Sequence, residues 1–346
     1  MEPIGPLFPR SRYVGELRAE LPDSIFEPAH SRLALIPLYL AISVAAIAAI
    51  AMHLVPWPLV PLVSIAIGAC FACMTFVAHE TLHGGTVRDK RWQLLVGWIG
   101  FLPFTLSPRL WIAWHNREHH GNTNLPGDPD CYATIERYGD RRSTRFSVDM
   151  FSLGGRRWRG ALSLVLGFTV QSVGQLFSMV PGVMSRRDHR LAFVETGLGL
   201  LVWAAVAALV GFVSFLFVFV LPLLVANACV MAFILTNHSL SPRVAVNDPL
   251  ISGLSVTTPR LIDWVTLRFG LHVEHHLFPA MSSRHAPAVR ALVMARWPER
   301  YQSMSLGAAL RRLHRTARVY KDATTLLDPT TGLEYPTLLP RVIPAA

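Results

Sequence analysis

The sequence predicts an all-α membrane protein, in which four transmembrane helices form two hairpins and a cytosolic helical cap holds a histidine-rich metal site. Hydrophobic residues make up 52% of the 346 residues and charged residues only 16%, a balance typical of chains that cross a bilayer. Nine of the 14 histidines fall into three short motifs and one further position, each beside an apolar segment of membrane length. Together these observations favour a metal site on a membrane scaffold over a soluble domain.

The first predicted hairpin follows a cytosolic N-terminal segment, residues 1–32, and pairs spans over 33–55 and 57–78. Residues 33–55 carry no charge and would extend roughly 34 Å as a helix, which is enough to cross a bilayer. Pro56 and Pro58 mark the turn between the two spans, because proline interrupts a helix.

The second hairpin is predicted to pair spans over 191–210 and 215–235, with a break near Gly211. Neither hairpin turn contains Lys or Arg, whereas the segments outside the hairpins hold nearly all of them. Basic residues tend to stay on the cytosolic side of a membrane, so both termini and the 79–190 loop are expected there. The prediction is an integral, multi-pass membrane protein whose histidine motifs share the cytosolic face.

Other segments have less regular patterns. Residues 93–106 are short for a span and contain Pro103, so we interpret them as interfacial or re-entrant. Residues 160–184 mix apolar residues with glutamine and are expected to lie along the membrane surface. The main domain, which contains the four spans and all the histidine motifs, is predicted to cover 33–320, followed by an extended C-terminal tail, 321–346, rich in Thr and Pro.

The nine clustered histidines are candidate metal ligands, because neutral imidazole is a common protein ligand for transition metals. On a helix, a spacing of four residues brings two rings to one face, as for His79 and His83 or His115 and His119. Nine ligands exceed what one ion can use, so the sequence predicts two metal ions. The alternative, nine structural imidazoles beside a bilayer, would require a partner for every buried ring. The candidates are His79, His83, His115, His119, His120, His238, His272, His275 and His276.

The ligand type alone leaves the metal open, since imidazole suits zinc, copper, iron and nickel. A structural zinc site would use four ligands, often including cysteine, and none of the four cysteines lies in a histidine motif. Two irons with open coordination positions would instead form an oxygen-activating centre. Glu80, Glu118 and Glu274 lie between the histidines, either as acceptors that orient the imidazole rings or as solvated neighbours.

The spacing of these motifs resembles that of the membrane fatty acid desaturase family. The similarity is carried by residues 79–83, 114–130 and 272–279, and it covers the chain from about 33 to 290. The resemblance implies four transmembrane helices capped by a cytosolic domain, with a non-haem di-iron centre held by the nine histidines. His238 matches an additional ligand that the family places just after its fourth span.

The resemblance also implies the reaction: a double bond is introduced into the acyl chain of a fatty acid or lipid, and O2 is reduced to water. The third motif opens with His272, not with the Gln common in front-end desaturases, and no His-Pro-Gly-Gly haem motif occurs. Electrons are therefore expected from a separate carrier of the ferredoxin or cytochrome b5 type. The expected cofactors are two Fe ions (Fe2+/Fe3+) with O2 as co-substrate, and the expected partners are a lipid acyl chain, the bilayer and the carrier.

Two other functions remain open. A di-iron hydroxylase of lipids or carotenoids could use the same centre, because hydroxylation and desaturation share it. A metal transporter would place ionisable ligands near the bilayer midplane, where the predicted spans offer little besides Glu195.

The net charge of +10 comes without a nucleic-acid recognition motif, so nucleic acid is not an expected partner. The charge fits anionic headgroups, an acidic electron carrier or a merely solvated surface. Arg109, Arg117 and Arg268 are candidates either for binding a polar headgroup or for anchoring the chain at the interface.

Overall fold

The computed structural model describes residues 5–178, 183–316 and 318–340, most of them in helices. They form two compact units, between which the chain passes several times. Unit 1 consists of Met1–Glu27, Glu118–Leu164 and Ala232–Ala346, and unit 2 consists of Pro28–Arg117 and Val165–Met231. Residues 1–4 of the predicted N-terminal segment and 341–346 of the predicted tail lie outside the described residues.

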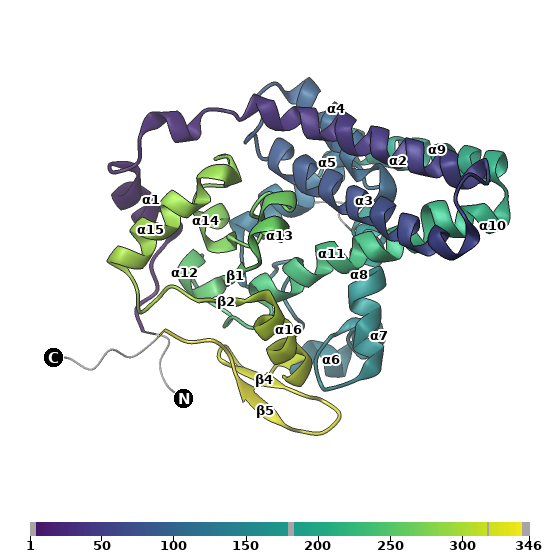
Figure 1. The fold of residues 1–346 in the computed structure, drawn as a ribbon. Coiled ribbons are helices and arrows are strands. Elements are labelled where there is room, and N and C mark those ends of the chain that lie inside the picture. The colour runs from purple at the N-terminus through teal and green to yellow at the C-terminus, as the bar shows by residue number, and fades with distance from the viewer. Residues whose placement is uncertain (1–4, 179–182, 317, 341–346) are drawn as a thin grey trace. The chain divides into compact units, whose positions relative to one another are not determined.

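The first predicted hairpin is present in unit 2. After the 3-10 helix η2 (His30–Ala34), it consists of α2 (Leu35–Ala51), the 3-10 helix η3 (Trp57–Leu59) and α3 (Val60–Leu82). Figure 1 shows α2 and α3 side by side. α3 ends where Gly84 adopts a left-handed φ of 90°, a conformation that favours glycine. This end places His83 at the C-cap of α3.

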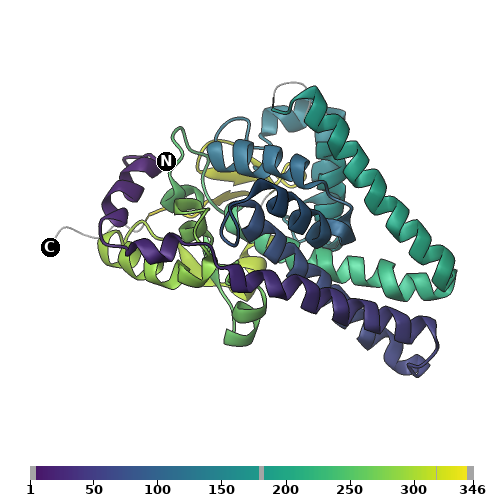
Figure 2. The same cartoon turned by 90° about the horizontal axis from the view of Figure 1, so that it is seen from above.

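The second hairpin begins with the long helix α9 (Arg186–Val210) and continues through α10 (Phe212–Phe215), the π-helix η7 (Leu216–Val220) and α11 (Leu221–His238). Gly211, with a φ of 78°, forms the turn, and Figure 2 shows α9 turning sharply into α10 at its far end. Large apolar side chains remain exposed along α9, for example Leu209 at 85%, as expected for a helix that contacts lipid.

Among the described residues, five helical segments are long and apolar enough to cross a membrane: Asp23–Ala51, Trp57–Leu82, Trp158–Ser178, Arg186–Val210 and Phe212–His238. Four of them correspond to the predicted spans. The additional segment joins the 3-10 helix η6 (Trp158–Gly160) to α8 (Ala161–Ser178), which we expected along the membrane surface. The structure thus offers five candidate spans where the sequence predicted four.

A bent pair of helices would raise this number to six if the pair counts as one span. The first arm contains α4 (Lys90–Phe101) and the 3-10 helix η4 (Leu102–Phe104); the second contains α5 (Pro108–Trp111) and the π-helix η5 (Ile112–His119). The arms meet at 100°, where Thr105 adopts a left-handed φ of 51°. Such a bend is compatible with the interfacial or re-entrant segment predicted at 93–106.

Unit 1 contains short helices around its own hydrophobic core. There, α1 (Arg10–Arg18) packs with α14 (His272–Leu277) and α15 (Ala286–Arg296). The ring of Tyr13 meets that of Trp297 edge-on, with centroids 4.8 Å apart. The N-terminal segment therefore packs behind the helix of the third histidine motif. The other helices of the unit are η1 (Asp23–Phe26), α6 (Ile135–Asp140), α7 (Arg142–Phe151), α12 (Pro249–Ser252), α13 (Arg260–Val265), η8 (Ser283–His285) and α16 (Leu306–Arg315).

Unit 1 also contains two small sheets. Strands β1 (Ser255–Thr257) and β2 (Ser303–Ser305) are parallel, while β3 (Val319–Tyr320), β4 (Thr325–Leu327) and β5 (Glu334–Pro336) are antiparallel. The all-α prediction omitted these strands, because segments of two or three residues have no visible alternation. The predicted C-terminal tail accordingly contains a hairpin, drawn in yellow in Figure 1.

Candidate metal centre

Four buried imidazoles converge in unit 1. His119 ends η5, His238 ends α11, and His272 and His276 lie on α14. Each ring has a nitrogen within 4.8 Å of a nitrogen on each of the other three. The Nε2 atom of His272 lies 2.7 Å from Nε2 of His238 and 3.0 Å from Nε2 of His276. A single proton can bridge only one such pair at a time, whereas a metal ion can accept all four lone pairs.

Hydrogen bonds hold the outer nitrogen of two of these rings. His119 Nδ1 lies 3.0 Å from a carboxylate oxygen of Asp128, and His238 Nδ1 lies 2.9 Å from the backbone oxygen of Ser252. Because an ionised carboxylate and a carbonyl only accept hydrogen bonds, the Nδ1 atoms carry the protons. In His238 this leaves the Nε2 lone pair free for a metal. In His119 burial lowers the pKa, but the charges of Asp128 and Asp130 outweigh burial and raise the pKa to about 9, so a metal would displace the Nε2 proton of that ring.

His276 is held in the same way by a hydroxyl. Its Nδ1 atom lies 3.2 Å from Thr123 Oγ1, which also donates to the backbone oxygen of His119. Burial, followed by the neighbouring imidazoles, lowers the pKa of His276 well below its usual value. The ring is therefore neutral near pH 7, which is the form that binds a metal.

Asp128 organises the loop that follows the second motif. Besides approaching His119, its carboxylate accepts the backbone N–H groups of Asn124 (2.8 Å) and Asp130 (2.9 Å). Burial alone would raise the pKa of Asp128, but His119 and these N–H groups outweigh burial and lower it. Sequence reasoning included Asp128 only within the family motif, although a carboxylate nine residues after a histidine ligand was the available signal.

The acidic residues within the motifs have other partners. The carboxylate of Glu274 is fully buried and accepts hydrogen bonds from Ser255 Oγ (2.6 Å) and Tyr301 OH (2.5 Å). Glu80 is buried and ion-paired with Arg32. The interpretation of Glu80 and Glu274 as solvated neighbours of the histidines is therefore wrong. Both anchor the helices that carry the histidines.

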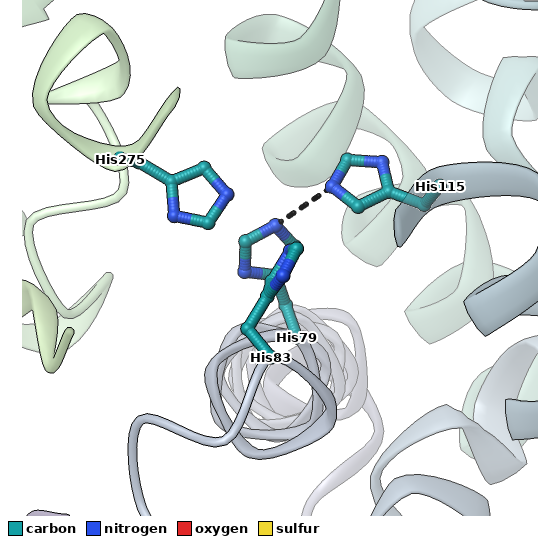
Figure 3. A group of neighbouring side chains, drawn as sticks. All are labelled: His79, His83, His115 and His275. Carbon is teal, nitrogen blue, oxygen red and sulfur yellow. Dashed lines mark hydrogen bonds between the residues drawn. The ribbon is translucent and has the colours of Figure 1, made fainter. Parts of the chain in front are cut away.

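Three more imidazoles gather in unit 2. His79 and His83 come from the end of α3 and His115 from η5, and one nitrogen of each lies within 4.8 Å of the others. Figure 3 shows the rings of His79 and His115 facing each other, with their Nε2 atoms 3.2 Å apart. His275, drawn in the same figure, belongs to unit 1.

Neighbouring side chains fix this second group. The indole of Trp111 stacks on His115 with centroids 4.4 Å apart and meets His79 and His83 edge-on at 5.2 Å. The amide of Asn116 donates to the backbone oxygen of Leu82 at 3.0 Å. Because Asn116 follows His115 directly, this bond ties η5 to the end of α3.

The remaining two candidates, His120 and His275, meet within unit 1. Their Nε2 atoms lie 3.1 Å apart, and the ring of His120 stacks on that of His276 at 4.2 Å. All nine predicted histidines thus have another predicted histidine as a neighbour.

The second motif departs from the expected helix geometry. His115 and His119 were expected on one face of an α-helix, but η5 is a π-helix, in which hydrogen bonds join residues five apart and which often occurs at functional sites. His115 joins the group in unit 2, and His119 joins the group in unit 1. One helical segment therefore supplies both groups.

The residues present fit a histidine-bound transition metal. The donors are imidazoles whose nitrogens converge, no cysteine belongs to either group, and imidazole-rich sites suit iron among other metals. Next to His238, the fully buried amide of Asn237 has no hydrogen-bond partner within the described part of the chain. Such a buried polar group is expected to face a water or another ligand that the fold encloses.

The arginines proposed for headgroup binding have protein partners. Arg109 is ion-paired with Glu195 (2.9 Å) and Asp188 (3.3 Å). Arg117 donates to the backbone oxygen of Val183 at 3.4 Å, and Arg268 bonds the backbone oxygen of Arg284. Arg109 therefore holds α5, which leads directly into the second motif, against α9.

Comparison with known proteins identifies the family of this chain. Residues 55–308 match the profile of the family described as fatty acid desaturase. A relative named omega-6 fatty acid desaturase, chloroplastic, from Spinacia oleracea is 21% identical over 308 residues, or 86% of this chain and 67% of the relative. The protein of the same name from Brassica napus is 22% identical over 256 residues, or 70% of this chain and 55% of the relative. Since the family profile covers well over half of its length, the chain belongs to the fatty acid desaturase family.

Proposed function

We propose that this protein is an O2-dependent desaturase that introduces a double bond into the acyl chain of a fatty acid or lipid. The observation that carries the proposal is the convergence of imidazole ring nitrogens in two groups, on a chain of this family. The group of His119, His238, His272 and His276 would hold one iron, and that of His79, His83 and His115 would hold the other. His120 and His275 are further ligands.

The overall reaction balances with a separate electron carrier. Bound iron would supply the activation of O2, which is the oxidant: two hydrogens leave adjacent methylene groups, and O2 takes them up with two electrons and two protons to give two waters. The carbon–carbon double bond forms in place of the two broken C–H bonds. A carrier of the ferredoxin or cytochrome b5 type is proposed as the source of the electrons.

The side chains of this protein would keep the ligands ready for metal. Asp128 and the backbone oxygen of Ser252 hold protons on the outer nitrogens of His119 and His238, so that their Nε2 atoms would be directed to the metal. Burial keeps His276 neutral. Apolar side chains at the histidines, such as the buried Trp111, would help to exclude water from the reacting chain.

The proposed location follows from the distribution of charge and apolar helices. We propose a multi-pass membrane protein with the metal centre and both termini on the cytosolic side, where the Lys- and Arg-rich segments belong. The acyl chain would come from the bilayer itself. The double-bond position named for the two relatives is not transferred to this chain.

Lipid profiling tests the proposal directly. Expression in a host without desaturases should produce a new unsaturated acyl chain, detected by mass spectrometry, and the purified protein should contain two irons. His238→Ala should abolish the new lipid and lower the iron content without loss of folded, membrane-inserted protein. His314→Ala changes an exposed histidine of α16 and should leave both unchanged.

The same experiment separates the alternatives. A hydroxylated acyl chain or carotenoid in place of an unsaturated chain would support the di-iron hydroxylase. One zinc and no iron in the active, purified protein would contradict the di-iron centre. Full iron and activity in His238→Ala would remove His238 from the ligand set.

A further inference from the structure

The helix α13 of unit 1 exposes a cluster of large apolar side chains. Leu261 and Trp264 are each 69% exposed and Ile262 is 42% exposed, although α13 lies outside every candidate span. On helix α15, Met294 is 47% exposed and lies four residues after Arg290, on the same face of that helix. Leu261 and Trp264 are three residues apart and therefore share one face of the helix.

Arginines surround these apolar side chains. Arg260 begins α13, and Arg268, which follows the helix, is ion-paired with Asp263 at 3.9 Å. Arg268 also donates to the backbone oxygen of Arg284. Burial raises the pKa of Asp263, and the positive charges of Arg268 and Arg290 oppose that shift, which places Arg290 of α15 near α13. Four arginines thus accompany one aspartate, and we call this surface the α13 patch: Arg260, Leu261, Ile262, Trp264, Arg268, Arg284, Arg290 and Met294.

The α13 patch is held in place by a specific turn. Leu267 and Arg268 both adopt left-handed backbone conformations, with φ of 56° and 58°, which are uncommon for residues other than glycine. The N–H of Arg268 donates to the backbone oxygen of Asp263 at 2.7 Å, and Ser283 Oγ donates to that of Leu267. These hydrogen bonds fix the turn after α13 and therefore hold the helix with its apolar side chains exposed.

We propose that the α13 patch docks on the surface of a membrane that contains anionic lipids. Tryptophan is enriched where hydrocarbon meets headgroups, aliphatic side chains enter the acyl region, and arginines bind lipid phosphates. An acidic protein would match the arginines but would not require Leu261 and Trp264 to project into its surroundings. The inference does not depend on the reaction catalysed, and it places a membrane contact seven residues before His272.

Spin labels at the patch measure its depth in lipid. Trp264→Cys and, separately, Leu261→Cys are labelled with a nitroxide in the full chain reconstituted into vesicles of phosphatidylcholine and phosphatidylglycerol. The control is Leu333→Cys, because Leu333 is likewise an exposed (56%) apolar residue of unit 1. The four native cysteines are buried or half-buried, and the unsubstituted protein gives their background.

The labels at 264 and 261 should collide with dissolved oxygen, which concentrates in lipid, and should be shielded from a water-soluble nickel chelate. The label at 333 should collide less with oxygen and should be accessible to the nickel chelate. Vesicles of phosphatidylcholine alone should reduce the shielding, as should Arg260→Gln combined with Arg284→Gln. Nickel access at 264 and 261 equal to that at 333 would overturn the proposal, as would shielding that begins only when an acidic electron-carrier protein is added.

Discussion

At the scale of single residues, orientation distinguishes this histidine set from a collection of polar side chains. Each of His119, His238 and His276 has its Nδ1 atom engaged by a different kind of group, respectively a carboxylate, a carbonyl and a hydroxyl. The identity of the histidines could be predicted from the sequence. The groups that hold their Nδ1 atoms were less predictable: Asp128 lies nine residues after His119, but Ser252 and Thr123 come to the rings of His238 and His276 only through the tertiary fold.

Asp128→Asn tests how much the hydrogen bond between His119 and Asp128 contributes to metal binding. The amide keeps the shape of the side chain but loses the charge that fixes the proton on His119 Nδ1, and groups in this position typically contribute about 10–100-fold to metal affinity. Iron retained by the purified variant after exposure to a chelator should fall accordingly, while the amount of folded protein changes little. Asp140→Asn, at an exposed position of α6, is the matched control. Equal iron retention in both variants would show that Asp128 is not needed to orient His119.

The buried imidazole of His276 predicts how stability depends on pH. Its pKa in the folded, iron-free protein lies well below the usual value, so the unfolded chain takes up a proton more readily as the pH falls. The stabilising effect of the neutral ring is therefore complete above about pH 6.5 and is lost as the pH falls below that value. The thermal midpoint of the iron-free protein should drop on acidification across this range. The drop should be smaller in His276→Gln, and an identical profile for both proteins would contradict the role of this ring.

At the scale of helices, the three motifs differ in how far local spacing predicts them. His79 and His83 end a helix that Gly84 terminates, and His272 to His276 form one short helix, as the spacing and Pro279 indicated. The second motif forms a π-helix instead of the expected α-helix. The choice between these two forms depends on tertiary contacts, such as the bond from Asn116 to Leu82, which no spacing rule contains.

The helix α14 depends on a buried acid behind its histidines. In the intact protein, burial raises the pKa of Glu274, and hydrogen bonds to its carboxylate oppose that shift. Tyr301→Phe removes one of these hydrogen bonds and leaves a buried carboxylate oxygen without that donor. We expect a loss of about 1–3 kcal/mol in the free energy of unfolding of the iron-free protein, measured by denaturant titration in detergent. Tyr335→Phe, in the half-buried C-terminal hairpin, should cost less. A Tyr301→Phe variant as stable as the original would mean that Glu274 finds another partner.

At the scale of the whole molecule, apolar composition predicted the two hairpins but did not decide whether α8 crosses the membrane. A window of hydropathy reports only that a helix could enter lipid. It does not report that Asn227 of α11 accepts hydrogen bonds from both the backbone N–H and the hydroxyl of Thr169 on α8, at 3.0 and 3.3 Å. Such a polar contact holds α8 against the second hairpin whether or not α8 crosses the membrane.

The number of crossings decides on which side each terminus lies, because an even number returns the chain to its starting side. Basic residues stand on both sides of α8, with Arg156, Arg157 and Arg159 before it and Arg186, Arg187 and Arg190 after it. By the positive-inside rule, both ends of α8 should remain cytosolic. We therefore expect α8 to enter or lie along the membrane without crossing it, and both termini to share the cytosolic face.

Reporter fusions test this topology in living cells. A reporter active only in the cytosol, joined in turn before residue 5, after residue 155, after residue 184 and after residue 340, should be active at all four positions. One placed in the turn after Pro56 should be inactive, since that turn lies between the spans of the first hairpin and carries no Lys or Arg. Activity at 155 combined with inactivity at 184 would show that α8 crosses. The second and third motifs would then lie on opposite sides of the membrane, and the shared cytosolic face of the nine histidines would have to be given up.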